Sequence, residues 1–441
     1  MTRSGSTSGL AGPRSPEGGD AVGVSLGRDS AIEVTHLDDG PVVVTETVPG
    51  SGSVSLGFWF AVGSRDEDPE AAGASHFLEH LLFKGTPDRR ARDIAETVDA
   101  VGGDMNAFTG REYTAYYARL PAQELDLGLD ILVDVTTRPA FRPHDVEAER
   151  QVILEELLMD EDLPDDLTMT LLQDALFPDH GLGREVVGDK PTLEVMTRDQ
   201  IADFHQRWYT PANLVVAAAG GVEHDELLRA VRRHHVGIQP GPQPDRQQPV
   251  VAPRARASAH RPFEQVHLAL GWRALPIGHP DRYALAVLNQ VLGGGLSSRM
   301  FQEIREERGM AYTVYSSVSA YSDAGSALAY VATSPRRAPE ALSLLNSIVD
   351  DLASGGITDR ELEIARGYLE GSLVLGLEDN ASRMSRIGSN VTVRGTVIPI
   401  DDHVEAIRAV DRAAVERIAA ELFAAAPAIA VVGPADPTDL A

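Results

Sequence analysis

The sequence predicts an α+β protein built from two similar halves. Three features predict this fold class: short strands that do not alternate regularly with helices, long helices with apolar stripes, and an internal repeat. The chain has 441 residues, 43% of them apolar and 24% charged, which is enough for two or three domains with a sizeable core. We expect two α/β-roll-like domains, each a mainly antiparallel sheet packed against helices, joined by a Pro-rich linker.

The elements of the first half follow from local patterns. Strands are expected where β-branched and aromatic residues alternate between turn residues, and helices where apolar residues recur every three or four positions. A short buried helix is expected after the third strand, with Ser75 as its N-cap and Gly85 as its stop. The expected strands are 32–35, 42–46, 53–60, 104–109, 113–118 and 213–219, and the expected helices are 91–101, 122–136, 143–160 and several within 166–209.

A change in composition separates the halves. Six prolines, paired Gln and scattered Arg between Gly237 and Pro262 predict a linker. Beyond it, three segments repeat patterns of the first half in the same order, at offsets of about 212 to 216 residues, which indicates a duplicated domain. The expected divisions are a disordered lead-in at 1–29, a first domain at 30–236, a linker at 237–262 and a second domain at 263–436.

The charge balance limits the partners. With 66 acidic residues against 39 Lys and Arg, the net charge of −27 disfavours nucleic acid and anionic membranes. Basic peptides would be attracted, although a solvated acidic surface explains most of these charges equally well. No apolar run approaches the roughly 18 residues of a membrane span, and the lead-in lacks the apolar region of a secretory signal, so a cytoplasmic protein is expected. Without Cys, a transition metal must be held by His and carboxylate.

The short helix carries the most informative motif. His76 and His80 are four residues apart, so they project from one helical face and suit a single metal ion. Glu79 completes an H-x-x-E-H pattern, the inverted form of the H-E-x-x-H zinc motif. Its carboxylate would lie at the edge of the metal site, where it can accept a proton from water. The pattern therefore indicates hydrolytic chemistry.

A third ligand is expected from the helix at 143–160. Glu149 and Glu156 share a stripe with apolar residues, and a buried carboxylate needs a cation or a donor. Glu155 is the alternative to Glu156, but it turns about 100° away from the stripe. At an offset of about 216 residues, the second half has Ala365 and Ser372 in place of the two carboxylates, and it contains no second H-x-x-E-H. Only the first half is expected to bind metal.

From about residue 30 to 435 the sequence resembles the pitrilysin-like inverted-zincin peptidases, in particular the branch of mitochondrial processing peptidase and its bacterial relatives. The motifs that carry the resemblance are H-F-L-E-H-L-L-F-K-G-T at 76–86, N-A-F-T-G-R-E-Y-T at 106–114, E-R-Q-V-I-L-E-E at 149–156 and R-E-E-R-G-M-A-Y at 305–312. The resemblance implies one Zn²⁺ per chain, held by His76, His80 and Glu156. It implies Glu79 as general base and Glu149 as the carboxylate that orients a ligand.

The resemblance also implies a substrate site. A strand edge that binds an extended peptide is expected at Asn106, Ala107 and Phe108, although an ordinary core strand fits the same pattern. Arg305 and Tyr312 are expected to grip the substrate and to donate a hydrogen bond to the developing oxyanion. Arg308 is the alternative to Arg305.

The function expected from these features is that of a zinc endopeptidase, which cleaves peptides or unfolded segments. The resemblance implies two associated chains, expected as a homodimer, and neither nucleic acid nor a membrane is an expected partner. Two alternatives remain: a non-catalytic structural subunit, as some relatives are, and a processing peptidase dedicated to one precursor.

Overall fold

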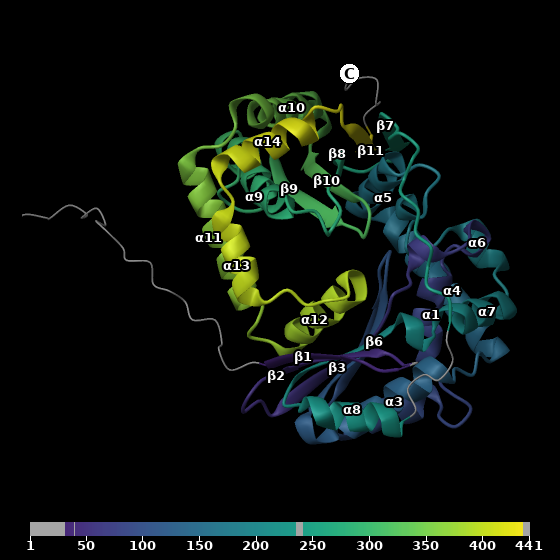
Figure 1. Ribbon diagram of the computed structural model, residues 1–441. Coiled ribbons are helices and arrows are strands. Elements are labelled where there is room, and N and C mark those ends of the chain that lie inside the picture. Colours follow the sequence, from purple (N-terminus) through teal and green to yellow (C-terminus); the bar gives the residue numbers. More distant parts are fainter. Residues whose placement is uncertain (1–30, 39, 235–240, 435–441) are drawn as a thin grey trace, which may run out of the picture.

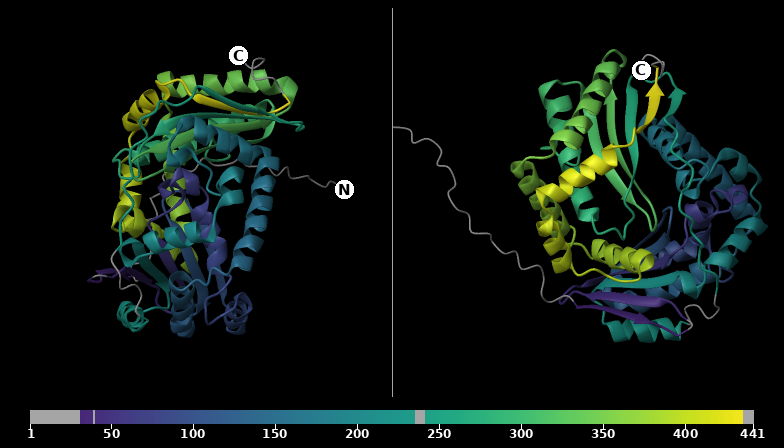
Figure 2. Two further views of the ribbon diagram at one scale, coloured as in Figure 1. Left: turned by 90° about the vertical axis from the view of Figure 1, so that its right-hand side faces the viewer. Right: turned by 45° about the horizontal axis from the view of Figure 1, so that its top comes forward.

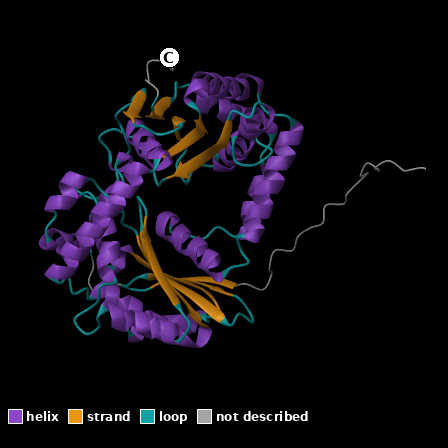
Figure 3. Ribbon diagram, turned by 180° about the vertical axis from the view of Figure 1, so that it is seen from behind, coloured by secondary structure: helices purple, strands orange, loops and turns teal. Residues whose placement is uncertain are grey.

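The computed structural model describes residues 31–38, 40–234 and 241–434. The expected lead-in at 1–29 and the start of the linker lie outside these residues. The described chain forms two separate sheets with helices between and around them, which confirms the expected α+β architecture (Figures 1 and 3).

The first sheet has six strands in the spatial order β1, β2, β6, β3, β5, β4. All neighbours are antiparallel except β2 and β6. Successive residues of β3 point to opposite faces, so Phe58 enters the main core of this half while Trp59 enters a second cluster on the other face. The strands are β1 Ala31–His36, β2 Val42–Thr47, β3 Ser53–Phe60, β4 Asp104–Thr109, β5 Thr114–Pro121 and β6 Leu214–Gly220.

The second sheet has five strands in the order β7, β11, β8, β10, β9. It repeats the plan of the first, with a single parallel pair, β11 and β7. The segment expected as a linker contains β7, because the outer edge of β11 accepts it as a further strand. The strands are β7 Arg256–His260, β8 Val266–Ala274, β9 Ala311–Ala320, β10 Gly325–Thr333 and β11 Ala428–Gly433.

Helices cover both sheets. None of the described helices has both the length and the apolar run that crossing a bilayer requires. Between α9 and β9 the chain forms a π-helix at Phe301–Glu307. The α-helices are α1 Ala74–Leu82, α2 Ala91–Ala100, α3 Leu125–Thr137, α4 Pro143–Asp162, α5 Pro164–Leu176, α6 Lys190–Val195, α7 Arg198–Trp208, α8 His224–Arg233, α9 Arg282–Leu292, α10 Ala338–Gly355, α11 Asp359–Leu375, α12 Asn380–Arg394, α13 Ile400–Ala409 and α14 Arg412–Phe423.

Two helices are exchanged between the halves. Helix α5, from the first half, packs on β7, β8 and β11 of the second sheet, while α12, from the second half, packs on β2, β3 and β6 of the first (Figure 1). In the right-hand view of Figure 2, α11 and α13 form the side of the molecule that leads to α12. Each sheet thus buries one face under a helix from the other half, and this covers apolar surface that neither half covers alone.

Candidate metal centre

Helix α1 presents the histidine motif from the first core. Its N-terminus is capped differently from the sequence expectation: Gly73, with φ of 95°, is the N-cap, and the Ser75 hydroxyl has no hydrogen-bond partner. The carboxylate of buried Glu67 accepts hydrogen bonds from the backbone N–H groups of Gly73 (2.8 Å) and Ser75 (2.7 Å). The Ser75 prediction was therefore wrong, because a side chain eight residues upstream satisfies the orphan donors of the helix.

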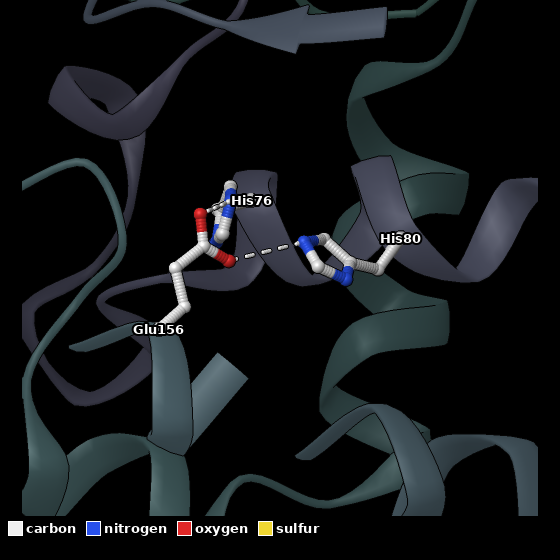
Figure 4. Close-up of side chains that lie close together, drawn as sticks. All are labelled: His76, His80 and Glu156. Carbon is white, nitrogen blue, oxygen red and sulfur yellow. Dashed lines mark ion pairs between the residues drawn. The ribbon is translucent and has the colours of Figure 1, made fainter. Parts of the chain in front are cut away.

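The two histidines meet a carboxylate from α4, which packs against α1. Glu156 Oε1 lies 3.8 Å from His76 Nε2, and Glu156 Oε2 lies 3.5 Å from His80 Nε2. Figure 4 shows the carboxylate facing both imidazoles. Glu155, the alternative considered from the sequence, is exposed on another face of α4. The structure thus brings together the three residues that the sequence predicts as ligands.

The donor set fits a zinc ion. The three ligand atoms lie within 4.8 Å of one another, and zinc bonds of about 2.0 to 2.2 Å would place them roughly 3 to 4 Å apart, so small side-chain shifts suffice. Burial, together with neighbouring His80, lowers the pKa of His76 to about 4. The ring is therefore neutral at pH 7, as a metal ligand must be. Glu156 is 42% exposed, which leaves the site open on one side.

Glu149 fixes the orientation of one ligand. Its Oε2 lies 3.0 Å from His80 Nδ1, and its Oε1 lies 2.5 Å from Lys84 Nζ. A carboxylate accepts the Nδ1 hydrogen, which leaves the Nε2 lone pair of His80 directed at Glu156. Lys84 supplies the cation that the buried Glu149 carboxylate needs. The sequence indicated the need for such a cation or donor, but it did not identify Lys84.

Glu79 lies beside the three candidate ligands. Thr109, the last residue of β4, donates a hydrogen bond of 2.6 Å from its hydroxyl to Glu79 Oε2. Burial raises the pKa of Glu79, while this hydrogen bond and His80 oppose the shift. A carboxyl group with a raised pKa can exchange a proton near neutral pH more readily than an exposed one. Thr109 was part of a quoted motif, but its contact with Glu79 was not anticipated.

The expected substrate edge is a true sheet edge among the described strands. Strand β4 pairs with β5 on one side only. The backbone N–H of Ala107 donates to the side-chain oxygen of its neighbour Asn106 at 2.8 Å, and Phe108 is partly exposed. Because an edge strand can pair with an added chain, this geometry suits an extended peptide.

Arg305 and Tyr312 lie together on the second half. Arg305 Nη1 donates to the Tyr312 carbonyl at 3.0 Å, and its guanidinium lies 4.5 Å from the centre of the Tyr312 ring. Tyr312 is 77% exposed, so its side chain is accessible to a ligand. Arg308, the alternative, donates instead to the Glu303 carbonyl at the other side of the π-helical turn.

Comparison with known proteins identifies the family. Residues 42–190 match the model of the insulinase family, peptidase family M16, and residues 196–369 match the model of the peptidase M16 inactive domain. An uncharacterized zinc protease of Mycobacterium tuberculosis is 44% identical over 410 residues, covering 91% of this chain and 92% of that protein. The chain belongs to peptidase family M16. This confirms the resemblance to pitrilysin-like peptidases.

Other M16 proteins agree in sequence and in fold. The uncharacterized zinc protease YmxG of Bacillus subtilis is 36% identical over 396 residues, covering 90% of this chain and 97% of that protein. The structure of a protease from Helicobacter pylori superposes with a TM-score of 0.84 at 22% identity, covering 91% of this chain and 99% of the other. A peptidase M16 inactive domain from Pseudomonas fluorescens also gives 0.84, at 20% identity, covering 92% and 98%. At these identities the two structures establish the M16 fold alone.

Proposed function

We propose that this M16 protein is a zinc-dependent endopeptidase that cleaves peptides or unfolded segments. One observation carries the proposal: His76, His80 and Glu156 converge from two helices, with Glu79 beside them. One zinc ion per chain is proposed at these three residues. Zinc bound there would supply Lewis-acid chemistry, which activates water and polarises a peptide carbonyl.

The roles of the protein groups follow from their contacts. Glu79, steadied by Thr109, is proposed to accept a proton from the attacking water and to deliver it to the leaving amine. Glu149 holds His80 in the tautomer that leaves Nε2 free. The chain around Asn106 to Phe108 is proposed to pair with an extended substrate, and the Tyr312 hydroxyl, steadied by Arg305, to donate a hydrogen bond toward it.

The relatives' names support this reading, since several are named zinc proteases. The alternative of a non-catalytic structural subunit is favoured less, because such a subunit has no need to keep two histidines, a third ligand and a base in one place. A homodimer and a cytoplasmic location stay predictions. A processing role for a single precursor also stays open, and a cleavage profile on a peptide library would distinguish it from general peptide hydrolysis.

The decisive experiment compares wild type with Glu79→Gln. We expect both to carry zinc, measured by elemental analysis, because Glu79 is not one of the three proposed ligands. Hydrolysis of an unstructured fluorogenic peptide should fall by about 10² to 10⁴-fold in the variant, since the proton acceptor is removed. Glu96→Gln, on the exposed face of α2, is the matched control and should hydrolyse the peptide like wild type. Equal activity without Glu79 would overturn the mechanism.

A further inference from the structure

A basic cavity lies between the two halves, apart from the proposed ligands. It has a volume of about 310 Å³ and is lined by the turn after β4, the loop after β8, the end of β9, and helices α12 and α13. Its polar lining includes Arg111, Asn390, Arg394 and His403. In Figure 1, α12 lies between the two sheets, where the chain of one half covers the other, and α13 lies at the side of the molecule. The cavity has room for a small polar group larger than a single water molecule.

The positive charge at this cavity is not compensated by the described residues. Arg394, half-buried at the end of α12, forms no hydrogen bond or ion pair with the residues that the structure describes, and neighbouring Arg282 has no carboxylate partner among them. Burial and the charge of Arg282 both lower the pKa of Arg394. The carbonyl end of α12 offers only about half a negative charge. Such uncompensated cations are unexpected in a chain of net charge −27.

His403 is arranged as a hydrogen-bond donor. Arg282 Nη2 donates to the Tyr283 hydroxyl at 2.7 Å, and this hydroxyl lies 2.8 Å from His403 Nδ1. Because arginine can only donate, the hydroxyl hydrogen of Tyr283 is available to Nδ1. This arrangement favours the imidazole tautomer with its hydrogen on Nε2. Burial, and after it the charges of the surrounding Arg residues, lowers the pKa of His403 to about 4, so the ring is neutral at pH 7.

The acidic groups nearby do not fill the role of counter-ion. Glu112 lines the cavity, but its Oε1 is bonded to Arg65 and its Oε2 to the backbone N–H of Ser322. Asp402 is exposed to solvent beside His403. The cavity therefore presents a guanidinium and an N–H donor with no carboxylate of the described chain bonded to them.

We propose that this cavity binds a carboxylate group of the polypeptide substrate. The inference rests on the proposed peptidase function. Gly110, which lines the cavity, directly follows Thr109, and Thr109 contacts Glu79. A substrate paired with β4 would therefore pass the cavity at one end of the strand. The carboxylate belongs either to an acidic side chain or to the C-terminus of the peptide. Both present the same charged group, to which a guanidinium can donate hydrogen bonds.

The test measures binding, so it does not depend on turnover. Two pairs of labelled, unstructured peptides are titrated into the full-length Glu79→Gln protein, with fluorescence anisotropy as readout. One pair differs by a C-terminal acid against an amide, and the other by an internal Glu against Gln. We expect the acidic member of one pair to bind about tenfold more tightly than its neutral partner, and that pair identifies the source of the carboxylate.

Arg394→Gln, made in the same background, should bring the acid-to-neutral affinity ratio of that pair to about one. Arg360→Gln, on the exposed face of α11, is the control and should keep the ratio. If Arg394→Gln does not fold, Arg282→Gln is expected to lower the ratio in the same way. Equal binding within both pairs, or a ratio that survives these substitutions, would overturn the inference. A wild type that cleaves no peptide yet shows the Arg394-dependent ratio would refute the peptidase proposal alone.

Discussion

At the scale of single residues, Glu149 orients the His80 ring through one carboxylate oxygen and pairs with Lys84 through the other. Replacing it with Gln keeps the shape but removes the negative charge that holds the Nδ1 hydrogen. We expect Glu149→Gln to lower zinc affinity by about 10 to 100-fold, measured by competition with a chromogenic chelator. Glu147→Gln, exposed on the same helix, is the control. Unchanged affinity in Glu149→Gln would show that His80 needs no such partner.

Glu67 makes stability depend on pH. Burial raises its pKa from 4.5 to about 7, outweighing the hydrogen bonds from Gly73 and Ser75 that lower it. Between pH 4.5 and 7 the folded protein keeps a proton that the unfolded chain releases, so this group's contribution to the free energy of unfolding falls as pH rises through that window. The difference corresponds to about 3 kcal/mol.

The measurement is urea unfolding of the chelator-treated protein at pH 5 and pH 7.5. The decrease between the two pH values should be smaller in Glu67→Gln than in wild type, because the variant has no proton to lose. Glu70→Gln, exposed nearby, should keep the wild-type decrease. A pH profile that Glu67→Gln leaves unaltered would mean that this carboxyl is not the group that titrates.

At the scale of elements, the exchange of α12 depends on close approach. Trp59 of β3 donates from Nε1 to Met384 Sδ of α12 at 3.3 Å, and a Cβ added at Gly388 would overlap the Trp59 indole. Arg383 and Arg386 of α12 also pair with buried Glu46 of β2. The apolar and the charged contacts together hold the helix on a sheet that belongs to the other half.

Gly388→Ala is therefore expected to lower the free energy of unfolding by about 1 to 3 kcal/mol through overpacking, although alanine favours a helix. Gly367→Ala, in the exposed part of α11 where an added Cβ meets nothing, should instead be neutral or stabilising by up to about 1 kcal/mol. Chemical denaturation of both variants gives the comparison. Similar effects at the two glycines would contradict the close packing of α12 on Trp59.

Across the whole molecule, a buried ion network joins the two sheets. Arg65 pairs with Glu112 in the first half and, through two hydrogen bonds of 2.7 Å, with Asp323 after β9 in the second. Ser322 also donates to Glu112 from its backbone and its hydroxyl. The turn after β4, next to the proposed substrate edge, is thereby fixed to the hairpin of the second half.

Asp323→Asn leaves the buried Arg65 with one counter-ion fewer, so we expect a loss of about 3 kcal/mol in the free energy of unfolding. Urea unfolding of the variant, followed separately by fluorescence and by circular dichroism, should also give midpoints that differ between the two probes. The reason is that the two halves then unfold less cooperatively. Glu363→Gln, in an exposed pair with Arg360, should change stability by no more than about 1 kcal/mol. An equally small effect at Asp323 would show that the network does not join the halves energetically.

The two halves, most element positions and the three candidate ligands could be predicted because their signals are local or repeated. The spacing of His76 and His80 places both on one helical face, and the stripe on α4 selects Glu156 over Glu155. The contacts of Glu67, Lys84 and Thr109 with the site could not be predicted. They join residues whose positions depend on how α1, α4 and β4 pack, and no period in the sequence encodes that packing.

By itself the sequence determined the secondary structure, the duplication and the residue types able to bind a metal, since backbone periodicity and side-chain chemistry are properties of neighbouring residues. Tertiary structure alone decided that α5 and α12 each pack on the sheet of the other half, that β7 joins the second sheet, and that no carboxylate of the described residues pairs with Arg394. These outcomes depend on contacts between apolar faces and charges that lie more than a hundred residues apart in the sequence. Such contacts form only when the complete fold buries the surfaces that make them.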